Sequence, residues 1–392
     1  MMNAVLIILG ALLASAVLAE FAARMWIRRF GGYYVLPPGV RMRLRPDPDT
    51  FPSMEKFVRF DVNADGERAG AVPRAEGLYR ILVAGGSQPE GYLLDQSTFW
   101  PGRLQTLLRT REYQARLSAS SVHVGSIARS GVGSEALDLI FRRVLGRYPR
   151  LQLIIILVGA SDVLRWLEAG APTTPPPPVQ VDDTFRCHPE VAFGLKPSRL
   201  AIVEVLRRLR HRWLRPIQFQ DRACKWIGRA RTMRANAKEM RTTVPDPSPM
   251  LRHFDTHFRH AIEKAKAHAD RVLVIRQPWF DKPCAPNEAA QMWHGAIGQA
   301  WREQVTTFFS HEVLRRLMAA LDARAAEIAA ELNVEQLDMR PHLEPSVDNY
   351  YDFFHVTPLG ASTFANVVAN SVLREPLEDQ RPYEPDLNRK VS

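Results

Sequence analysis

Three side chains in this sequence of 392 residues are of the types that perform acyl transfer together. Ser87 follows an apolar run and two glycines in the stretch ILVAGGSQPEG, residues 81–91. Asp352 stands three residues before His355, shortly ahead of a stretch with a helical pattern. A serine nucleophile needs a neighbouring base and a group that orients that base. These residue types therefore predict a Ser-His-Asp triad.

Glycine-flanked loops supply the other groups that such a site requires. The stretch ARSGVGS contains Gly131 and Gly133, and the stretch GASD contains Ser161. Loops of this kind leave backbone N–H groups free to bind the oxyanion of a tetrahedral intermediate. Gly131 is also compatible with an ordinary turn, and the two roles do not exclude each other.

Five short apolar segments predict the strands that position these groups. They are residues 79–86, 120–126, 151–161, 271–278 and 334–339. The segment LQLIIILVGAS is apolar almost throughout, which is typical of a strand buried on both faces of a parallel sheet. Helical patterns separate the strands, so we predict an α/β fold, a three-layer αβα sandwich around a five-stranded, mostly parallel, flavodoxin-like sheet.

The predicted strands bring the chemically active residues to one edge of the sheet. Ser87 follows the first strand, Gly131 the second and Ser161 the third, while Asp352 and His355 follow the fifth. Ligands of open parallel sheets bind at the carboxyl ends of the strands. We therefore expect these five residues to converge.

Four sequence blocks resemble, in order, those of the SGNH/GDSL hydrolase superfamily. The blocks are GGSQPEG, SGVGS, GASD and DFFH, and the resemblance covers roughly residues 40–375. It implies that Ser87 is the nucleophile and that Asp352 and His355 complete the triad. It also implies an oxyanion hole formed by the N–H groups of Ser87 and Gly131, with Ser161 beside them.

Ser161 departs from the family pattern, because the family has an asparagine there whose side chain donates to the oxyanion. A hydroxyl also donates, but it is shorter. Losing one such donor lowers the rate by about 10²–10³. The resemblance implies a serine esterase that cleaves O-acyl (acetyl) esters of a glycan or lipid-linked substrate. Two alternatives stay open, an O-acetyltransferase with the same triad and a catalytically inactive anchored module that binds or assembles polysaccharide. We expect no cofactor and no metal.

The first nineteen residues carry no charge and are long enough to cross a bilayer. A cleaved signal peptide is the rival interpretation, but no Lys or Arg precedes the apolar run. We predict a single-pass N-terminal membrane anchor with its flank, residues 1–30. Arg24, Arg28 and Arg29 favour a cytoplasmic flank, whereas the resemblance to anchored relatives implies an extracytoplasmic domain. We predict the periplasmic side.

The rest of the chain divides by composition. We predict a connecting strand-and-turn region at 31–78, a hydrolase-like domain at 79–378 and a tail at 379–392. The interval 163–270 is too long for an ordinary connection, so we interpret it as a helical insertion. It begins with the proline run APTTPPPPV, residues 171–179.

One part of this insertion accounts for the whole net charge of +10. Residues 196–241 contain fourteen Lys and Arg residues and three acidic ones. The pattern predicts amphipathic helices whose cationic face is solvated or contacts an anionic surface such as lipid. No nucleic-acid-binding motif accompanies the charge, so we expect no nucleic acid. The three cysteines form neither a disulfide framework nor a zinc pattern.

Two further stretches have two interpretations each. HFDTHFRH places His253, His257 and His260 along one helical face, a spacing that suits a metal, although such histidines are usually incidental. The stretch 276–295, with Trp293 and His294, either lines an acyl or sugar pocket or packs as a surface loop.

Overall fold

A five-stranded parallel sheet forms the centre of the protein. The computed structural model describes residues 2–190, 193–194, 199–206, 217–220 and 222–374. The strands follow the order β10-β8-β5-β3-β4, with bounds β3 (Leu78–Gly85), β4 (Ser121–Ser126), β5 (Leu151–Leu157), β8 (Ala269–Arg276) and β10 (Glu335–Asp338). All four pairings are parallel. This is the flavodoxin-like order, so the predicted fold class is confirmed.

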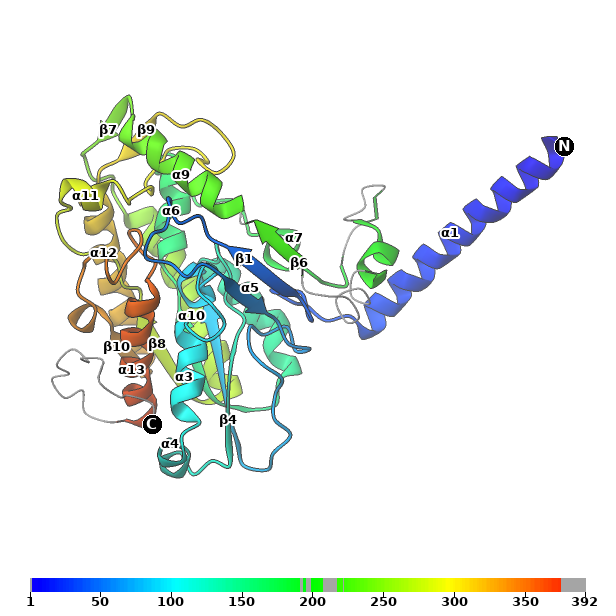
Figure 1. The fold of residues 1–392 in the computed structure, drawn as a ribbon, viewed down its shortest axis with the longest axis horizontal. Coiled ribbons are helices and arrows are strands. Elements are labelled where there is room, and N and C mark those ends of the chain that lie inside the picture. Colours follow the sequence, from blue (N-terminus) through cyan, green and yellow to red (C-terminus); the bar gives the residue numbers. More distant parts are fainter. Residues whose placement is uncertain (1, 191–192, 195–198, 207–216, 221, 375–392) are drawn as a thin grey trace, which may run out of the picture.

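Helices cover both faces of this sheet (Figure 1). Helices α3 (Trp100–Leu108) and α13 (Pro358–Leu373) pack against each other, and Trp100 stacks on Phe364 at 4.9 Å between ring centroids. Helices α5 (Ser134–Val144), α10 (Ser248–His268) and α12 (His311–Glu331) form the other layer. Ile154, Ile155 and Ile156 of the central strand β5 are each 0% exposed, as the uninterrupted apolar run of this strand predicts.

Further short elements complete the described chain. The helices are α2 (Ser87–Glu90), α4 (Arg111–Arg116), α6 (Ala160–Glu168), α7 (Val181–Thr184), α9 (Arg222–Ala235) and α11 (Pro286–Ala289). Single 3-10 turns lie at Leu145–Arg147 and Arg340–His342. Strands β7 (Glu239–Arg241) and β9 (Thr307–Phe309) pair in parallel.

The last helix of the predicted insertion belongs to the layer around the central sheet. Helix α10 packs along α5 and against β8, and its Phe254 and Phe258 are buried in the main core. It is the crossover helix that returns the chain from β5 to β8. We therefore propose a shorter insertion, residues 171–247, than the predicted range 163–270.

The connecting region before the sheet and the insertion form a second sheet together. Strand β1 (Arg41–Arg45) pairs antiparallel with β2 (Val58–Asp61) and in parallel with β6 (Ile217–Gln220). The order β2-β1-β6 thus joins two segments that lie far apart in the sequence. The basic stretch 207–216 and the predicted tail 379–392 lie outside the described residues.

Helix α1 (Met2–Phe30) projects away from the body of the protein (Figure 1). Its segment Ala4–Arg29 is long and apolar enough to cross a membrane, and the apolar window within it is not buried in the protein. Length and composition fit an anchor and a signal sequence alike. At the body end, Glu20 accepts hydrogen bonds from the N–H groups of Ala201 and Ile202.

Candidate active site

A sharp turn after β3 presents Ser87. Gly85 has φ +154°, and a Cβ atom there would lie 1.8 Å from the carbonyl oxygen of Leu157. Only glycine allows this close approach of the β3 end to β5. Ser87 then begins α2, where the first N–H groups of a helix have no intrahelical acceptor. The sequence GGS therefore places a half-buried hydroxyl at the end of β3, beside free backbone donors.

The structure brings Ser87, His355 and Asp352 into one hydrogen-bonded chain. The Nε2 atom of His355 lies 2.7 Å from the Oγ atom of Ser87, and its Nδ1 atom lies 2.8 Å from Oδ2 of Asp352. An ionised carboxylate only accepts, so Nδ1 carries the proton and donates it to Asp352. Nε2 is then left with a lone pair that accepts the hydroxyl proton of Ser87.

Asp352 is fully buried and charged. Burial alone would raise the pKa of Asp352, but the adjacent imidazole of His355, which donates a hydrogen bond, and the N–H of Phe354 hold it well below its ordinary value. Both the Phe354 and the His355 N–H groups donate to its Oδ1 at 2.9 Å. The carboxylate therefore stays ionised and fixes the orientation of the imidazole.

Trp293 is a further partner of Asp352. Its Nε1–H donates to Oδ2 of Asp352 at 3.0 Å, and its ring packs edge-on against Trp226 at 4.7 Å. In the same stretch, Trp279 and Phe280 are almost fully buried, with 1% and 0% exposed, so they belong to the core. The prediction of a pocket lining or a surface loop is thus wrong for these two residues.

His294 lies next to the triad without joining its chain. Burial lowers the pKa of His294 to about 3, so its ring is neutral. Ligand atoms of His294, Asp352 and His355 lie within 4.8 Å of one another, a grouping able to hold a metal. His355 is already hydrogen-bonded to both Asp352 and Ser87, however, so membership of the predicted triad is the interpretation that we keep for these two side chains.

Two arginines of α9 hold the loops around the triad. Arg231 donates to the carbonyl oxygens of Gln291 and Tyr351, both at 2.9 Å. Arg234 donates to the carbonyl oxygens of His294 and Phe309. Both side chains face inward, so the predicted cationic face of 196–241 is wrong for these two residues. Contact of the segment with an anionic surface stays a prediction.

The three predicted oxyanion residues lie around the nucleophile turn. Gly131 has φ +80°, and its N–H has no hydrogen-bond acceptor among the residues that the structure describes. The Oγ atom of Ser161 lies 3.8 Å from the position of a Cβ atom at Gly86, directly before Ser87. Their roles as oxyanion donors remain predictions.

Buried carboxylates anchor the loop that carries Gly131. Glu90, at the end of α2, accepts from the N–H of Ser130 at 2.8 Å and from its hydroxyl. Asp162 accepts from the N–H of Ser134 at 2.9 Å and from its hydroxyl at 2.6 Å, which caps α5. The loop is therefore tied at both ends to the elements that carry Ser87 and Ser161.

The connecting region contributes a fully buried arginine to the short helix that begins at Ser87. Arg68 donates to the carbonyl oxygens of Glu90, Gly91 and Leu94, and its guanidinium lies 3.9 Å from the ring centroid of Phe99. Burial lowers the pKa of Arg68 to about 9, so it remains charged at neutral pH.

Comparisons with known proteins give remote structural likenesses. No protein-family model matches the sequence, and no curated protein is significantly similar to it in sequence. An acetylxylan esterase, Axe2, from Geobacillus stearothermophilus aligns with a TM-score of 0.39 and 11% identity, over 75% of this chain and 94% of that one. A member of the lipolytic G-D-S-L family from Veillonella parvula aligns with a TM-score of 0.40 and 10% identity, over 76% and 99%. Likeness at this level identifies neither a substrate nor a reaction, so both have to be argued from the geometry of the site.

Proposed function

We propose that this protein is a serine ester hydrolase in which Ser87 is the nucleophile, His355 the general base and Asp352 the group that orients the base. The hydrogen-bonded chain from Asp352 through His355 to Ser87, with contacts of 2.8 and 2.7 Å, carries the proposal. A serine hydroxyl that merely completes a turn has no need of a buried imidazole–carboxylate pair aimed at it.

The proposed reaction proceeds in two halves. Nε2 of His355 takes the proton of Ser87 while Oγ bonds to the ester carbonyl carbon, and the carbonyl oxygen becomes an oxyanion. The N–H groups of Ser87 and Gly131 and the hydroxyl of Ser161 bind this oxyanion. His355 gives its proton to the leaving alcohol, which leaves an acyl-Ser87. Water, deprotonated by His355, then releases the carboxylic acid and restores the hydroxyl of Ser87.

The substrate class that we propose is an O-acylated, in the first place O-acetylated, glycan or lipid-linked saccharide. Half-buried aromatic side chains of Trp226, Trp293 and Tyr351 cluster next to His355, and Tyr351 stacks on its ring at 5.4 Å. Flat aromatic faces of this kind suit the apolar face of a sugar ring. They support a carbohydrate in preference to a long acyl chain.

We further propose that α1 anchors the protein in a membrane with the catalytic domain on the periplasmic side. The exposed apolar surface of α1 supports insertion into lipid. A fusion of alkaline phosphatase after Ser392 tests the side. Phosphatase activity in intact cells is the expected result, whereas fluorescence of a cytosol-only reporter at the same position would overturn the assignment.

The activity is tested with full-length protein in detergent. A fluorophosphonate probe should label Ser87 alone, located by peptide mass spectrometry, and p-nitrophenyl acetate should be hydrolysed. Ser87→Ala should abolish both, whereas Ser53→Ala, at an exposed serine outside the site, should change neither. Folded protein that is neither labelled nor active would contradict the proposal and favour an inactive binding module. Acetyl transfer to an added xylo-oligosaccharide in preference to water would reassign the enzyme as an O-acetyltransferase.

A further inference from the structure

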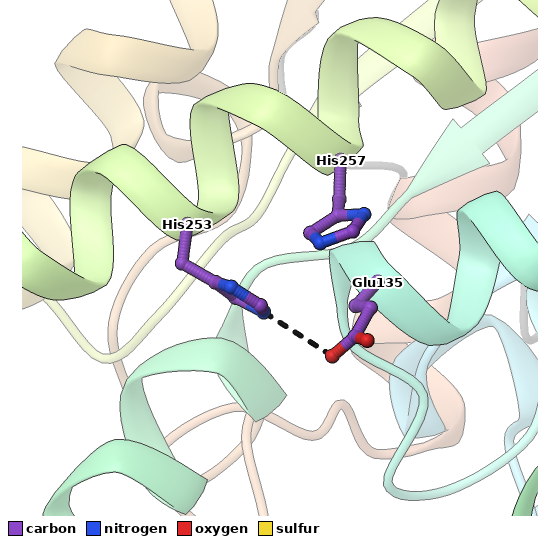
Figure 2. A group of neighbouring side chains, drawn as sticks. All are labelled: Glu135, His253 and His257. Atoms are coloured by element: carbon purple, nitrogen blue, oxygen red, sulfur yellow. Dashed lines mark ion pairs between the residues drawn. The ribbon is translucent and has the colours of Figure 1, made fainter. Parts of the chain in front are cut away.

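A second group of chemically active side chains lies between α5 and α10, away from the triad. His253 and His257 are one helical turn apart on α10 and face Glu135 of α5 (Figure 2). One ligand atom from each of the three residues lies within 4.8 Å of the other two. The spacing of four residues places both imidazoles on one side of the helix. The two helices thus aim two nitrogens and a carboxylate at the same space.

The separations within this group already approach those of a coordinated metal. Nε2 of His253 lies 3.3 Å from Oε2 of Glu135, and the two imidazole centroids are 4.6 Å apart. Two ligands of a tetrahedral Zn²⁺, each about 2.0–2.1 Å from the ion, are roughly 3.3 Å apart. The side chains of Glu135, His253 and His257 are 14%, 20% and 21% exposed, so they are shielded but within reach of an ion from solvent.

Neighbouring contacts orient two of the three ligands. Nδ1 of His257 lies 3.2 Å from Oδ2 of Asp138, and donation to that carboxylate leaves Nε2 unprotonated and free for a metal. Oε1 of Glu135 accepts from the N–H of Val179 at 2.9 Å, which leaves Oε2 for the metal. Imidazoles that bind metals commonly donate their other N–H to a carboxylate in this way.

Both carboxylate oxygens of Asp138 have partners of their own. Its Oδ2 atom lies 3.2 Å from Nδ1 of His257 and 3.5 Å from the guanidinium of Arg142. Lys264 lies 2.9 Å from its other oxygen, Oδ1. Asp138 is thus occupied by cations and serves as the outer partner, while Glu135 is the carboxylate available for coordination.

We propose that Glu135, His253 and His257 bind one divalent transition-metal ion, with Zn²⁺ as the natural candidate. Two imidazoles and one carboxylate are ligands that Zn²⁺ prefers, and a water molecule completes a tetrahedral site. Mg²⁺ and Ca²⁺ favour oxygen ligands only, so they are poor competitors. Through Glu135 and Val179, a bound ion would also fasten the proline run 171–179 to the helices α5 and α10.

Zinc binding is measured on full-length protein carrying no polyhistidine tag, by calorimetric titration with ZnCl₂ at pH 7.5 and by metal analysis after dialysis. One equivalent should bind in the micromolar range or tighter and raise the melting temperature, and MgCl₂ should do neither. His253→Ala and Glu135→Gln should each weaken binding by about tenfold or more. His268→Ala, on the same helix but outside the group, should bind as the unchanged protein does.

Two outcomes would overturn the proposal. One is the lack of a stoichiometric zinc site in folded protein, and the other is zinc binding that survives both His253→Ala and Glu135→Gln. Glu135→Gln keeps the acceptor for Val179, so it separates loss of a ligand from loss of folding, which circular dichroism without zinc checks. Ser87→Ala protein should retain the site.

Discussion

Replacing Trp293 by phenylalanine removes one hydrogen bond from the carboxylate of the proposed triad and leaves the aromatic packing largely in place. Trp293 donates to Oδ2 of Asp352 at 3.0 Å, the same oxygen that receives Nδ1–H of His355 at 2.8 Å. This hydrogen bond joins Trp293 to Asp352 and does not involve Ser87. It is therefore a positioning residue, which acts through Asp352.

The size of the effect follows from the number of donors to Asp352. The N–H groups of Phe354 and His355 and the ring of His355 remain after the substitution. A hydrogen bond to a charged group contributes about 1.5–3 kcal/mol, and the lower value applies where other donors stay in place. About 1.5 kcal/mol in the barrier lowers kcat/KM roughly tenfold. With p-nitrophenyl acetate we expect the loss in kcat rather than in KM, because this substrate has no sugar ring for the aromatic cluster to contact.

A double-mutant cycle tests this reasoning with p-nitrophenyl acetate as substrate. Trp293→Phe should lower kcat in the unchanged protein but have little further effect in Asp352→Asn protein, where the group through which it acts is already altered. Trp226→Phe, which keeps an aromatic ring against Trp293 and removes no hydrogen bond from Asp352, is the matched control. An equal loss in both backgrounds would refute the assignment, as would no loss at all.

Three further changes have expected outcomes. Ser161→Ala should lower kcat by about 10²-fold while fluorophosphonate still reacts slowly at Ser87, if the hydroxyl is an oxyanion donor; an unchanged kcat would exclude that role. Arg68→Ala removes the donor to the carbonyl oxygens of Glu90, Gly91 and Leu94. The substitution should lower the free energy of unfolding, measured in urea, by at least about 3 kcal/mol, and Arg68→Lys should have an intermediate effect. Glu67 is fully buried; burial would raise its pKa, but His123 and Arg80 lower it from 4.5 to about 2. Its carboxylate therefore stabilises the fold by about 3 kcal/mol above pH 4.5, and this contribution is lost as the pH falls towards 2. The melting temperature of Glu67→Gln should therefore depend less on pH between 4.5 and 2 than that of the unchanged protein.

The sheet could be predicted from sequence because each strand of a parallel sheet is an apolar run that ends at a turn. Segment 151–161 shows this most clearly, since β5 is buried on both faces. The extent of the insertion could not be predicted in the same way. Helix α10 follows a basic stretch and carries four histidines, which conceal the buried side of Phe254 and Phe258. Its place became evident only from its packing against α5.

The proposed triad was also accessible from sequence, because Ser87 follows a strand and Asp352 and His355 are close neighbours in the chain. The residues that support it were not. The bond from Trp293 to Asp352 joins two loops that only the tertiary fold brings together. Likewise, the many charges of α9 predict that its side chains are exposed to solvent. Arg231 instead points inward, because distant loops supply the carbonyl groups that it binds.

Guanidinium groups from outside the central fold hold both halves of the proposed site. Arg68, from the connecting region, fixes the turn that carries Ser87, and Arg231, from the insertion, fixes the loop that carries Asp352. Backbone carbonyls in the loops after parallel strands lie outside the hydrogen-bond pattern of the sheet. The planar guanidinium of an arginine binds several such carbonyls at once. We expect a chain that lacked these two regions to hold Ser87 and His355 less firmly, because the loop carbonyls on both sides would lose these donors. The 2.7 Å contact between Ser87 and His355 therefore depends on segments that no motif of the triad includes.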